Sequence, residues 1–226
     1  MKTLDNHPAA RQDLAGCVAL WLALLLLDAS GADAWLTRLY GSAQGFAWRN
    51  HWLTSDLLHQ GGRIASWILF AIVVAAVWRP WPAAARVAPR TRWWWLGCTV
   101  LCLLLISTIK HFSLTSCPWD LREFGGNAQW VSHWAFGASD GGPGRCFPSG
   151  HASGAFAFLA GYLALRESAP RPARIWLAVV LVLGAVFGWA QLMRGAHHLS
   201  HTLWTGAICW TVAVLTYHAT QRWRLR

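Results

Sequence analysis

The run IWLAVVLVLGAVFGWA, residues 175–190, carries no charged side chain and is too apolar throughout to be the half-buried helix of a soluble domain. Five more apolar runs can be read, at about residues 14–30, 64–78, 93–109, 152–165 and 203–219. Most fall short of the ~20 residues of an ideal membrane span, but flanking Trp, Gly or His residues extend each towards the interfaces. Charged residues make up 12% of the 226-residue chain, about half the usual share in a soluble domain. We therefore predict one domain, residues 1–226, of the all-α class: an integral membrane bundle of six transmembrane helices.

Basic residues are unevenly distributed between the segments that connect these runs. One set of segments holds twelve Lys or Arg against three acidic residues, and the remainder holds seven against six. Because positively charged segments stay in the cytoplasm, we expect both termini and residues 79–92 and 166–174 to be cytoplasmic. Residues 31–63, 110–151 and 191–202 then face the opposite side. The basic residues do not gather on one soluble face, so we expect no nucleic-acid partner.

Three polar clusters lie at the outer ends of the predicted helices. Lys110 ends the third run, Ser149-Gly150-His151 opens the fourth, and Arg194 and His197 follow the fifth. Two fixed cations and the free N–H groups at a helix start suit a bound phosphate. Two histidines allow one to attack phosphorus while the other protonates the leaving group. With no carboxylate cluster to hold Mg²⁺, this pattern indicates phosphoryl transfer without metal or cofactor.

The sequence Phe-Pro-Ser-Gly-His at residues 147–151, with a Lys motif before it and an Arg–His motif after it, resembles the type 2 phosphatidic acid phosphatase superfamily. Vanadate-dependent haloperoxidases share the fold of this superfamily. The resemblance covers about residues 110–206 by motif and all six predicted spans by architecture. It implies that His197 forms a phosphohistidine and that His151 is the general acid. Lys110 is implied to clamp the phosphate, with Ser149 and Gly150 supplying hydrogen-bond donors.

Three motif positions depart from the family pattern: Cys117 and Gln191 each stand where Arg is usual, and His201 stands where Asp is usual. Arg194 lies about one helical turn beyond Gln191, so we expect it to supply the missing guanidinium from the same face. His201 is a candidate to orient His197, although a neutral imidazole stabilises an imidazolium less than a carboxylate does. Asp120 in the preceding loop is the second candidate for that role.

The six cysteines divide into two groups. Four lie within the predicted helices as small core residues: Cys17, Cys98, Cys102 and Cys209. Cys117 and Cys146 flank the outer loop that carries the site motifs, and we predict a disulfide between them in an oxidising compartment. Asp28 sits near the end of the first run, where an intramembrane acid raises the question of function. His51, His59 and His133 lie in outer segments, and the sequence does not decide whether they contact a lipid head group.

Taken together, these features predict a membrane lipid-phosphate phosphatase that hydrolyses a phosphomonoester or pyrophosphate lipid at the outer face. Its partners are the lipid phosphate substrate and membrane lipids, and the charge pattern fits a bacterial inner membrane with a periplasmic active site. Candidate substrates are phosphatidic acid, phosphatidylglycerophosphate, undecaprenyl pyrophosphate and lipid A phosphate. A phosphotransferase, a non-catalytic relative of the same fold and a His-rich haem redox protein are the alternatives. The last is disfavoured because the histidines cluster at span ends, and no haem-attachment motif occurs.

Overall fold

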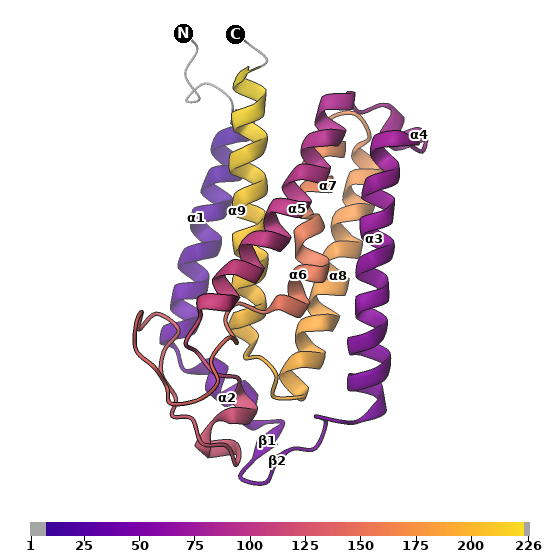
Figure 1. Cartoon of the computed structure of the whole chain (residues 1–226). Helices are drawn as coiled ribbons and strands as arrows, with labels where there is room; N and C mark the ends of the chain where they lie inside the picture. Colours follow the sequence, from indigo (N-terminus) through magenta and orange to yellow (C-terminus); the bar gives the residue numbers. More distant parts are fainter. Residues whose placement is uncertain (1–7, 224–226) are drawn as a thin grey trace.

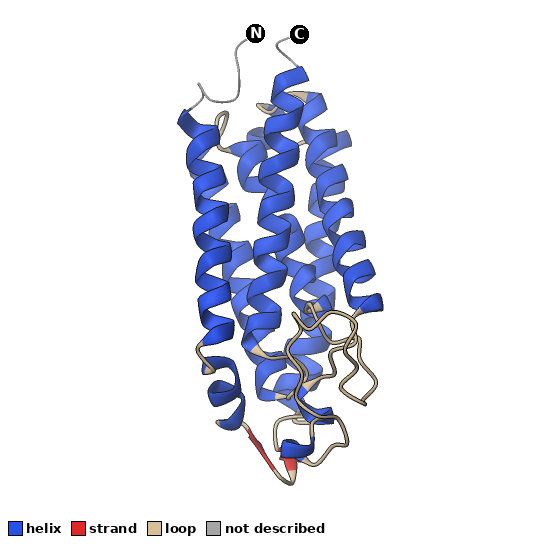
Figure 2. Cartoon of the chain, turned by 90° about the vertical axis from the view of Figure 1, so that its left-hand side faces the viewer, coloured by secondary structure: helices blue, strands red, loops and turns tan. Residues whose placement is uncertain are grey.

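A computed structural model describes residues 8–223 of the chain. Long helices run side by side along one axis, and a large irregular region closes one end of the bundle (Figure 1; Figure 2). In chain order the elements are α1 (Pro8–Ala29), α2 (Ala32–Arg38), β1 (Gly41–Ser42), β2 (Gly45–Phe46), the π-helix η2 (Leu53–Gln60), α3 (Gly61–Trp78), α4 (Pro82–Ala85), α5 (Pro89–Phe112), the 3₁₀ turns η3 (Pro118–Asp120) and η4 (Arg122–Phe124), α6 (Gly150–Phe156), the 3₁₀ turn η5 (Ala157–Leu159), α7 (Ala160–Leu165), α8 (Pro170–Met193) and α9 (Leu199–Trp223).

The two ends of the bundle differ in character (Figure 1). At one end α1 begins and α9 ends, beside the short connections through α4 and between α7 and α8. At the other end lie α2, the antiparallel hairpin β1–β2, the long loop between α5 and α6, and the tight turn between α8 and α9. The arrangement gathers the predicted site segments at a single end, which we call the loop end. Lys2, Asp5, Arg224 and Arg226, which contributed to the charge asymmetry, lie outside the described residues.

The all-α class is confirmed, whereas six membrane-spanning helices are not. Within residues 8–223, four helices are long and apolar enough to cross a membrane: Pro8–Ala29, Leu53–Trp78, Pro89–Phe112 and Pro170–Met193. The segment Gly150–Leu165 is shorter, and α9 is not among the four. Both occupy the middle of the bundle, where side chains meet other helices rather than lipid, and the first turns of α9 bury Ser200, His201, Thr202 and Thr205. The four outer helices indicate an integral membrane protein.

Helix ends also differ from the apolar runs, and the reason is local. The structure starts α5 at Pro89 and α8 at Pro170, because a proline in the first turn has φ already set for a helix and needs no hydrogen-bond partner for nitrogen. These helices therefore extend several residues beyond their apolar runs, and Lys110 lies in the last turn of α5. The outer segment of residues 31–63 is not a plain loop, because its last part, η2, continues directly into α3.

Two glycines of α8 allow unusually close packing at the centre. A Cβ at Gly184 would lie 2.2 Å from a ring carbon of Phe156 in α6, and one at Gly188 would lie 2.3 Å from Cγ2 of Thr202 in α9. Small residues at helix contacts are how membrane bundles bring backbones together. Large side chains such as Leu26, Trp67 and Leu104 instead remain exposed on the outer surface, as expected for contact with lipid tails.

The predicted disulfide between Cys117 and Cys146 is present, and it joins the η3 region to the residue just before the Phe-Pro-Ser-Gly-His motif. The other four cysteines are free and buried, as the sequence indicated. The bridge spans 29 positions of the chain, so it restricts a long loop in the unfolded state.

We expect reduction of this bridge to lower the free energy of unfolding by ~3–4 kcal/mol, the loss of chain-entropy restriction for a loop of this length. The measurement is thermal unfolding in detergent, followed by Trp fluorescence with and without a phosphine reductant. The Cys117→Ser, Cys146→Ser double variant is the control, since its melting temperature should not respond to the reductant. Two free thiols in the non-reduced wild type, found by mass spectrometry, would contradict the prediction.

Candidate active site

Three segments converge at the loop end: the last turn of α5, the start of α6 and the turn between α8 and α9. The start of α6 is held against α9 by backbone contacts, because the amide of Ser149 donates to the carbonyl of His201 (3.1 Å) and the hydroxyl of Thr205 donates to the carbonyl of Ser149 (3.0 Å). Ser149 also caps α6, accepting from the amide of Ala152. The two helix starts that carry the predicted histidines are therefore fixed relative to each other.

The α8–α9 turn sets the place of His197. Gly195 adopts φ +70°, and the amide of Ala196 donates to the carbonyl of Gln191 (2.9 Å) while that of Gly195 donates to Leu192 (2.9 Å). This pair of bonds is the Schellman arrangement, which ends a helix at a glycine in the left-handed region. A Cβ on Gly195 would also meet the ring of Phe46 at 2.4 Å. The turn brings His197 back over the end of α8, where its amide also donates to Gln191 (3.3 Å).

His197 is 6% exposed and its surroundings favour the neutral imidazole. Burial lowers the pKa of His197 to about 3, and the charge of Lys110 acts in the same direction. The Nδ1 atom lies 3.4 Å from Sγ of Cys146, a sulfur of the disulfide that can only accept. We therefore assign the proton to Nδ1, which leaves a lone pair on Nε2 for attack.

His151 lies in the first turn of α6, and its ring packs between His59 (centroids 4.5 Å apart) and Phe187 (5.1 Å). Its Nε2 atom is buried and has no hydrogen-bond partner among the described residues. Helix α3 approaches this ring through Gly62, where a Cβ would lie 3.1 Å from Nε2. An unpaired, buried ring nitrogen at this place is available for proton transfer to a bound group.

Lys110 reaches the same place from α5. Its side chain passes over Gly150, where a Cβ would lie 3.2 Å from Cδ of Lys110. The Nζ atom donates a short hydrogen bond to the carbonyl of Arg145, a non-glycine residue with φ +58°. That strained conformation directs a carbonyl at the ammonium group, and strain of this kind is found at functional sites.

Arg194 is the C-cap residue of α8. The helix therefore extends to Arg194, as required if Arg194 supplies the guanidinium that is missing at Gln191. Its Nη1 atom donates to Oε1 of Gln191 (3.4 Å), and its Nε donates to the carbonyl of Arg49 (3.0 Å). Gln191 in turn pairs with Nδ1 of His59 (3.0 Å). The residue at the family's Arg position thus holds both the neighbouring guanidinium and an additional histidine.

His59 was left undecided by sequence analysis, yet the structure stacks it on His151. It comes from the π-helix η2, a form that is rare and concentrates at functional sites. The distance in sequence between His59 and Gln191 is 132 residues, and no local pattern signals such a contact.

The two candidates to orient His197 have different positions. His201 is 1% exposed, with its ring centroid 5.8 Å from that of His197, but no hydrogen bond joins the two rings among the described contacts. Asp120 lies in η3, where burial raises its pKa and the positive charge of Arg49 opposes the shift. Within residues 8–223, no hydrogen bond or ion pair joins Asp120 to His197. The structure therefore brings His201, and not Asp120, close to His197.

A family model for the PAP2 superfamily matches residues 91–225, a stretch that contains all three motif segments. The chain belongs to the PAP2 superfamily, and the resemblance to type 2 phosphatidic acid phosphatases is confirmed. No curated protein and no solved structure showed significant similarity to the chain.

We expect Arg194→Ala to lower kcat/KM by about 100-fold or more, the usual cost of removing one charged donor from a phosphoryl or oxyanion site. Arg194→Lys should lose much of the activity too, because an ammonium lacks the planar two-point grip of a guanidinium. Gln191→Ala is the matched control and should cost only a few-fold, the value of about one neutral hydrogen bond. Turnover of the three variants on one good substrate decides the matter. Full activity of Arg194→Ala would show that the second cation comes from another residue, such as Arg63.

Proposed function

We propose that this PAP2 protein is a membrane phosphatase that hydrolyses a phosphomonoester or pyrophosphate lipid at the outer face through a phosphohistidine. The observation that carries the proposal is the gathering of His197, His151, Lys110 and Arg194 at the loop end, where His151 also lines an apolar cavity. A phosphate bound by Lys110 and Arg194 would lie beside His197, the proposed nucleophile. The apolar cavity would receive the rest of a lipid.

In the first step, Nε2 of neutral His197 attacks phosphorus, and the bond from phosphorus to the lipid oxygen breaks. His151 donates a proton to that oxygen, so the lipid leaves as an alcohol or, for a pyrophosphate, as a monophosphate. Lys110, Arg194 and the donors of Ser149 and Gly150 stabilise the charge on the non-bridging oxygens. In the second step, water gives its proton to His151 and attacks phosphorus, releasing phosphate and restoring His197.

The proposal assigns no role to a metal ion, because Lys110 and Arg194 supply the positive charge that a metal would otherwise provide. Within the described residues, one buried group has a metal-like arrangement: Cys146, His197 and His201, whose ligand atoms lie within 4.8 Å of one another. Since Cys146 is in the disulfide, its sulfur is not available as a thiolate ligand.

The apolar cavity supports a lipid substrate. It has a volume of about 430 Å³ and lies between α3 and α5, lined by Trp67, Phe70, Val100, Leu103, Leu104 and Phe158. At one end it reaches Gly150, His151 and Arg63, which places a charged group beside the catalytic histidine. An apolar cavity with a few polar groups at one end fits an acyl or prenyl chain whose phosphate is held at the loop end.

We expect His197→Ala to reduce phosphate release from a panel of lipid phosphates by several orders of magnitude, because it removes the covalent route. His151→Ala should be comparably severe for poor leaving groups. The control is His111→Ala, which removes an exposed histidine at the same end of α5 and should retain wild-type turnover. Near-wild-type release by His197→Ala would refute the proposed nucleophile. Recovery of a phosphorylated acceptor lipid in place of free phosphate would identify a phosphotransferase.

These assays are run in EDTA, since the proposal includes independence from divalent metals. Turnover should be unchanged by the chelator and inhibited by vanadate, which adopts the five-coordinate geometry of the transition state. Activity lost in EDTA and restored by Mg²⁺ would contradict this part of the proposal.

Filling the apolar cavity tests the class of substrate. We expect Leu103→Trp to lower kcat/KM for a long-chain lipid phosphate by about 10-fold, equivalent to lost burial of about two methylene groups. Its turnover of a short, water-soluble phosphate ester should be unchanged. The matched control is Leu181→Trp, in a separate apolar hollow of about 330 Å³ with no titratable side chain in its lining. Equal losses on both substrates would indicate a packing defect and not a lipid-binding role.

A further inference from the structure

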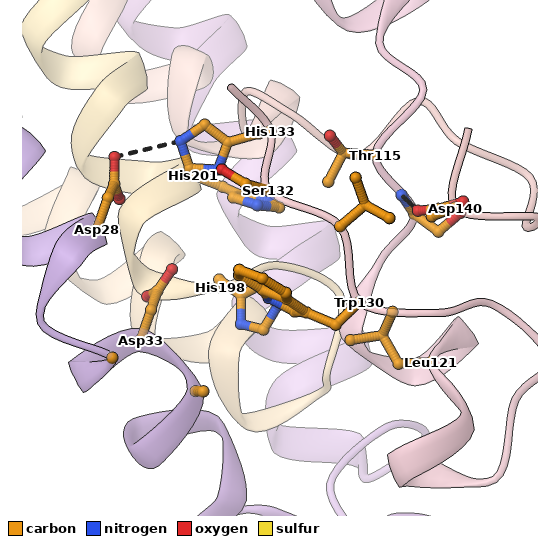
Figure 3. Close-up of a pocket in the computed structure, with 14 residues that line it drawn as sticks. Asp28, Asp33, Thr115, Leu121, Trp130, Ser132, His133, Asp140, His198 and His201 are labelled. Carbon is orange, nitrogen blue, oxygen red and sulfur yellow. Dashed lines mark hydrogen bonds and ion pairs between the residues drawn. The ribbon is translucent and has the colours of Figure 1, made fainter. Parts of the chain in front are cut away.

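A second, polar cavity lies behind the nucleophile, between α1, α9 and the long loop (Figure 3). Its volume is about 80 Å³, and it is more enclosed than the apolar cavity. Several carboxylates and histidines border it: Asp28, Asp33, Asp140, His133, His198 and His201. The mechanism above uses none of the three carboxylates.

Asp28 comes from the last turn of α1 and has an unusual set of contacts. Its Oδ2 atom accepts from Nε1 of Trp134 (2.8 Å), Nε1 of Trp204 (2.9 Å) and Nε2 of His133 (3.3 Å). Its Oδ1 atom is buried and has no hydrogen-bond partner among the described residues. Oδ2 of Asp28 therefore joins the long loop to α9. A buried polar atom such as Oδ1 normally has a hydrogen-bond partner, and no described residue supplies one.

Among the described residues, His201 also has an unpaired buried atom, and it lines the same cavity. It is 1% exposed, and its Nδ1 atom is buried without a partner among residues 8–223. Its ring meets that of His133 edge-on, with centroids 5.7 Å apart, and one of its nitrogens lies within 4.8 Å of a nitrogen of His197. His201 thus lies next to His197 and contacts His133, which pairs with Asp28.

Three other ionisable side chains around the cavity already have partners. Both oxygens of Asp33 accept from Ser200, from its amide and its hydroxyl. The oxygens of Asp140 accept from Ser116 and Gly142. His198 pairs through Nδ1 with the hydroxyl of Thr37 (2.8 Å). Of the described cavity side chains, Asp28 and His201 alone keep a buried polar atom unpaired.

We propose that Asp28 is the positioning carboxylate for His197, acting through His201 across this cavity. Water bridges Oδ1 of Asp28 to Nδ1–H of His201, since a water needs ~10–15 Å³ of such space and two or more polar partners. The carboxylate thereby fixes the tautomer and ring orientation of His201 and places a negative charge behind His197. The charge stabilises the positive imidazole that forms when His197 bonds to phosphorus. This inference rests on the proposed function.

A double-mutant cycle in the full-length protein tests the coupling. Asp28→Asn removes the charge but keeps an acceptor for the two indoles, and it should lower kcat by about 10–100-fold while leaving KM within about 2-fold. His201→Asp places a carboxylate directly behind His197. In that background, Asp28→Asn should leave kcat unchanged or raise it, because the charge of Asp28 is no longer needed and two nearby carboxylates repel each other.

Asp33→Asn is the matched control, since it removes a carboxylate from the same cavity whose oxygens are already paired. Its effect on kcat should be the same in both backgrounds. If His201→Asp does not fold, His201→Gln replaces it, and Asp28→Asn should then have no further effect on kcat. Equal losses from Asp28→Asn in both backgrounds, or wild-type kcat in Asp28→Asn, would overturn the inference.

Orthovanadate binding separates this inference from the proposed hydrolase activity. Vanadate also bonds to the nucleophile, so ⁵¹V NMR follows the same cycle without turnover. Asp28→Asn should weaken vanadate binding, and this effect should be absent in the His201→Asp background. That result supports the positioning role even if no lipid phosphate is hydrolysed. Vanadate affinity that does not respond to Asp28→Asn overturns it, whatever the outcome of the lipid assays.

Discussion

The hydrogen bonds between the first turn of α6 and the first turn of α9 are the constraint on which the site depends. The amide of Ser149 donates to the carbonyl of His201, and the hydroxyl of Thr205 donates to the carbonyls of Ser149 and His201. These bonds join two helix starts that are far apart in the chain. Inside an apolar bundle these groups have no water to bond instead, and breaking the contacts leaves them unsatisfied. The disulfide at Cys146 and the Schellman turn at Gly195 fasten the same region from either side. The relative positions of His151 and His197 follow from these contacts.

Positively and negatively charged side chains occupy different places around these two helix starts. Cations from α3, α5 and α8 lie near His151 and His197, and carboxylates from α1, α2 and the long loop border the cavity that His201 lines. In the proposed reaction, the cations attract the phosphate, and the carboxylates favour a His197 that becomes positive. Charged side chains of both signs therefore lie in one buried region. Among the described contacts, no direct ion pair neutralises Lys110 or Arg194.

The sequence was sufficient for features that depend on local pattern or on a motif. The all-α class followed from the apolar runs, the family from residues 147–151, and the Cys117–Cys146 bridge from the position of both cysteines around one loop. Features that depend on contacts over more than a hundred residues were not accessible. His59 pairs with Gln191 and Asp28 with Trp204 only because the bundle brings η2 to α8 and α1 to α9. Six membrane-spanning helices are not confirmed for a related reason, since helices at the centre of a bundle do not need the hydropathy of helices that face lipid.

The close approaches at Gly184 and Gly188 have a consequence for how this chain tolerates sequence change during evolution. At these two positions even a methyl group would collide with Phe156 or Thr202, so drift to alanine should be strongly selected against. Exposed residues such as Leu22 and Leu26 are free to exchange among any apolar side chains, because lipid makes no demand on shape. Sequence variation among relatives should therefore be greatest on the most hydrophobic surface and least at the smallest interior residues.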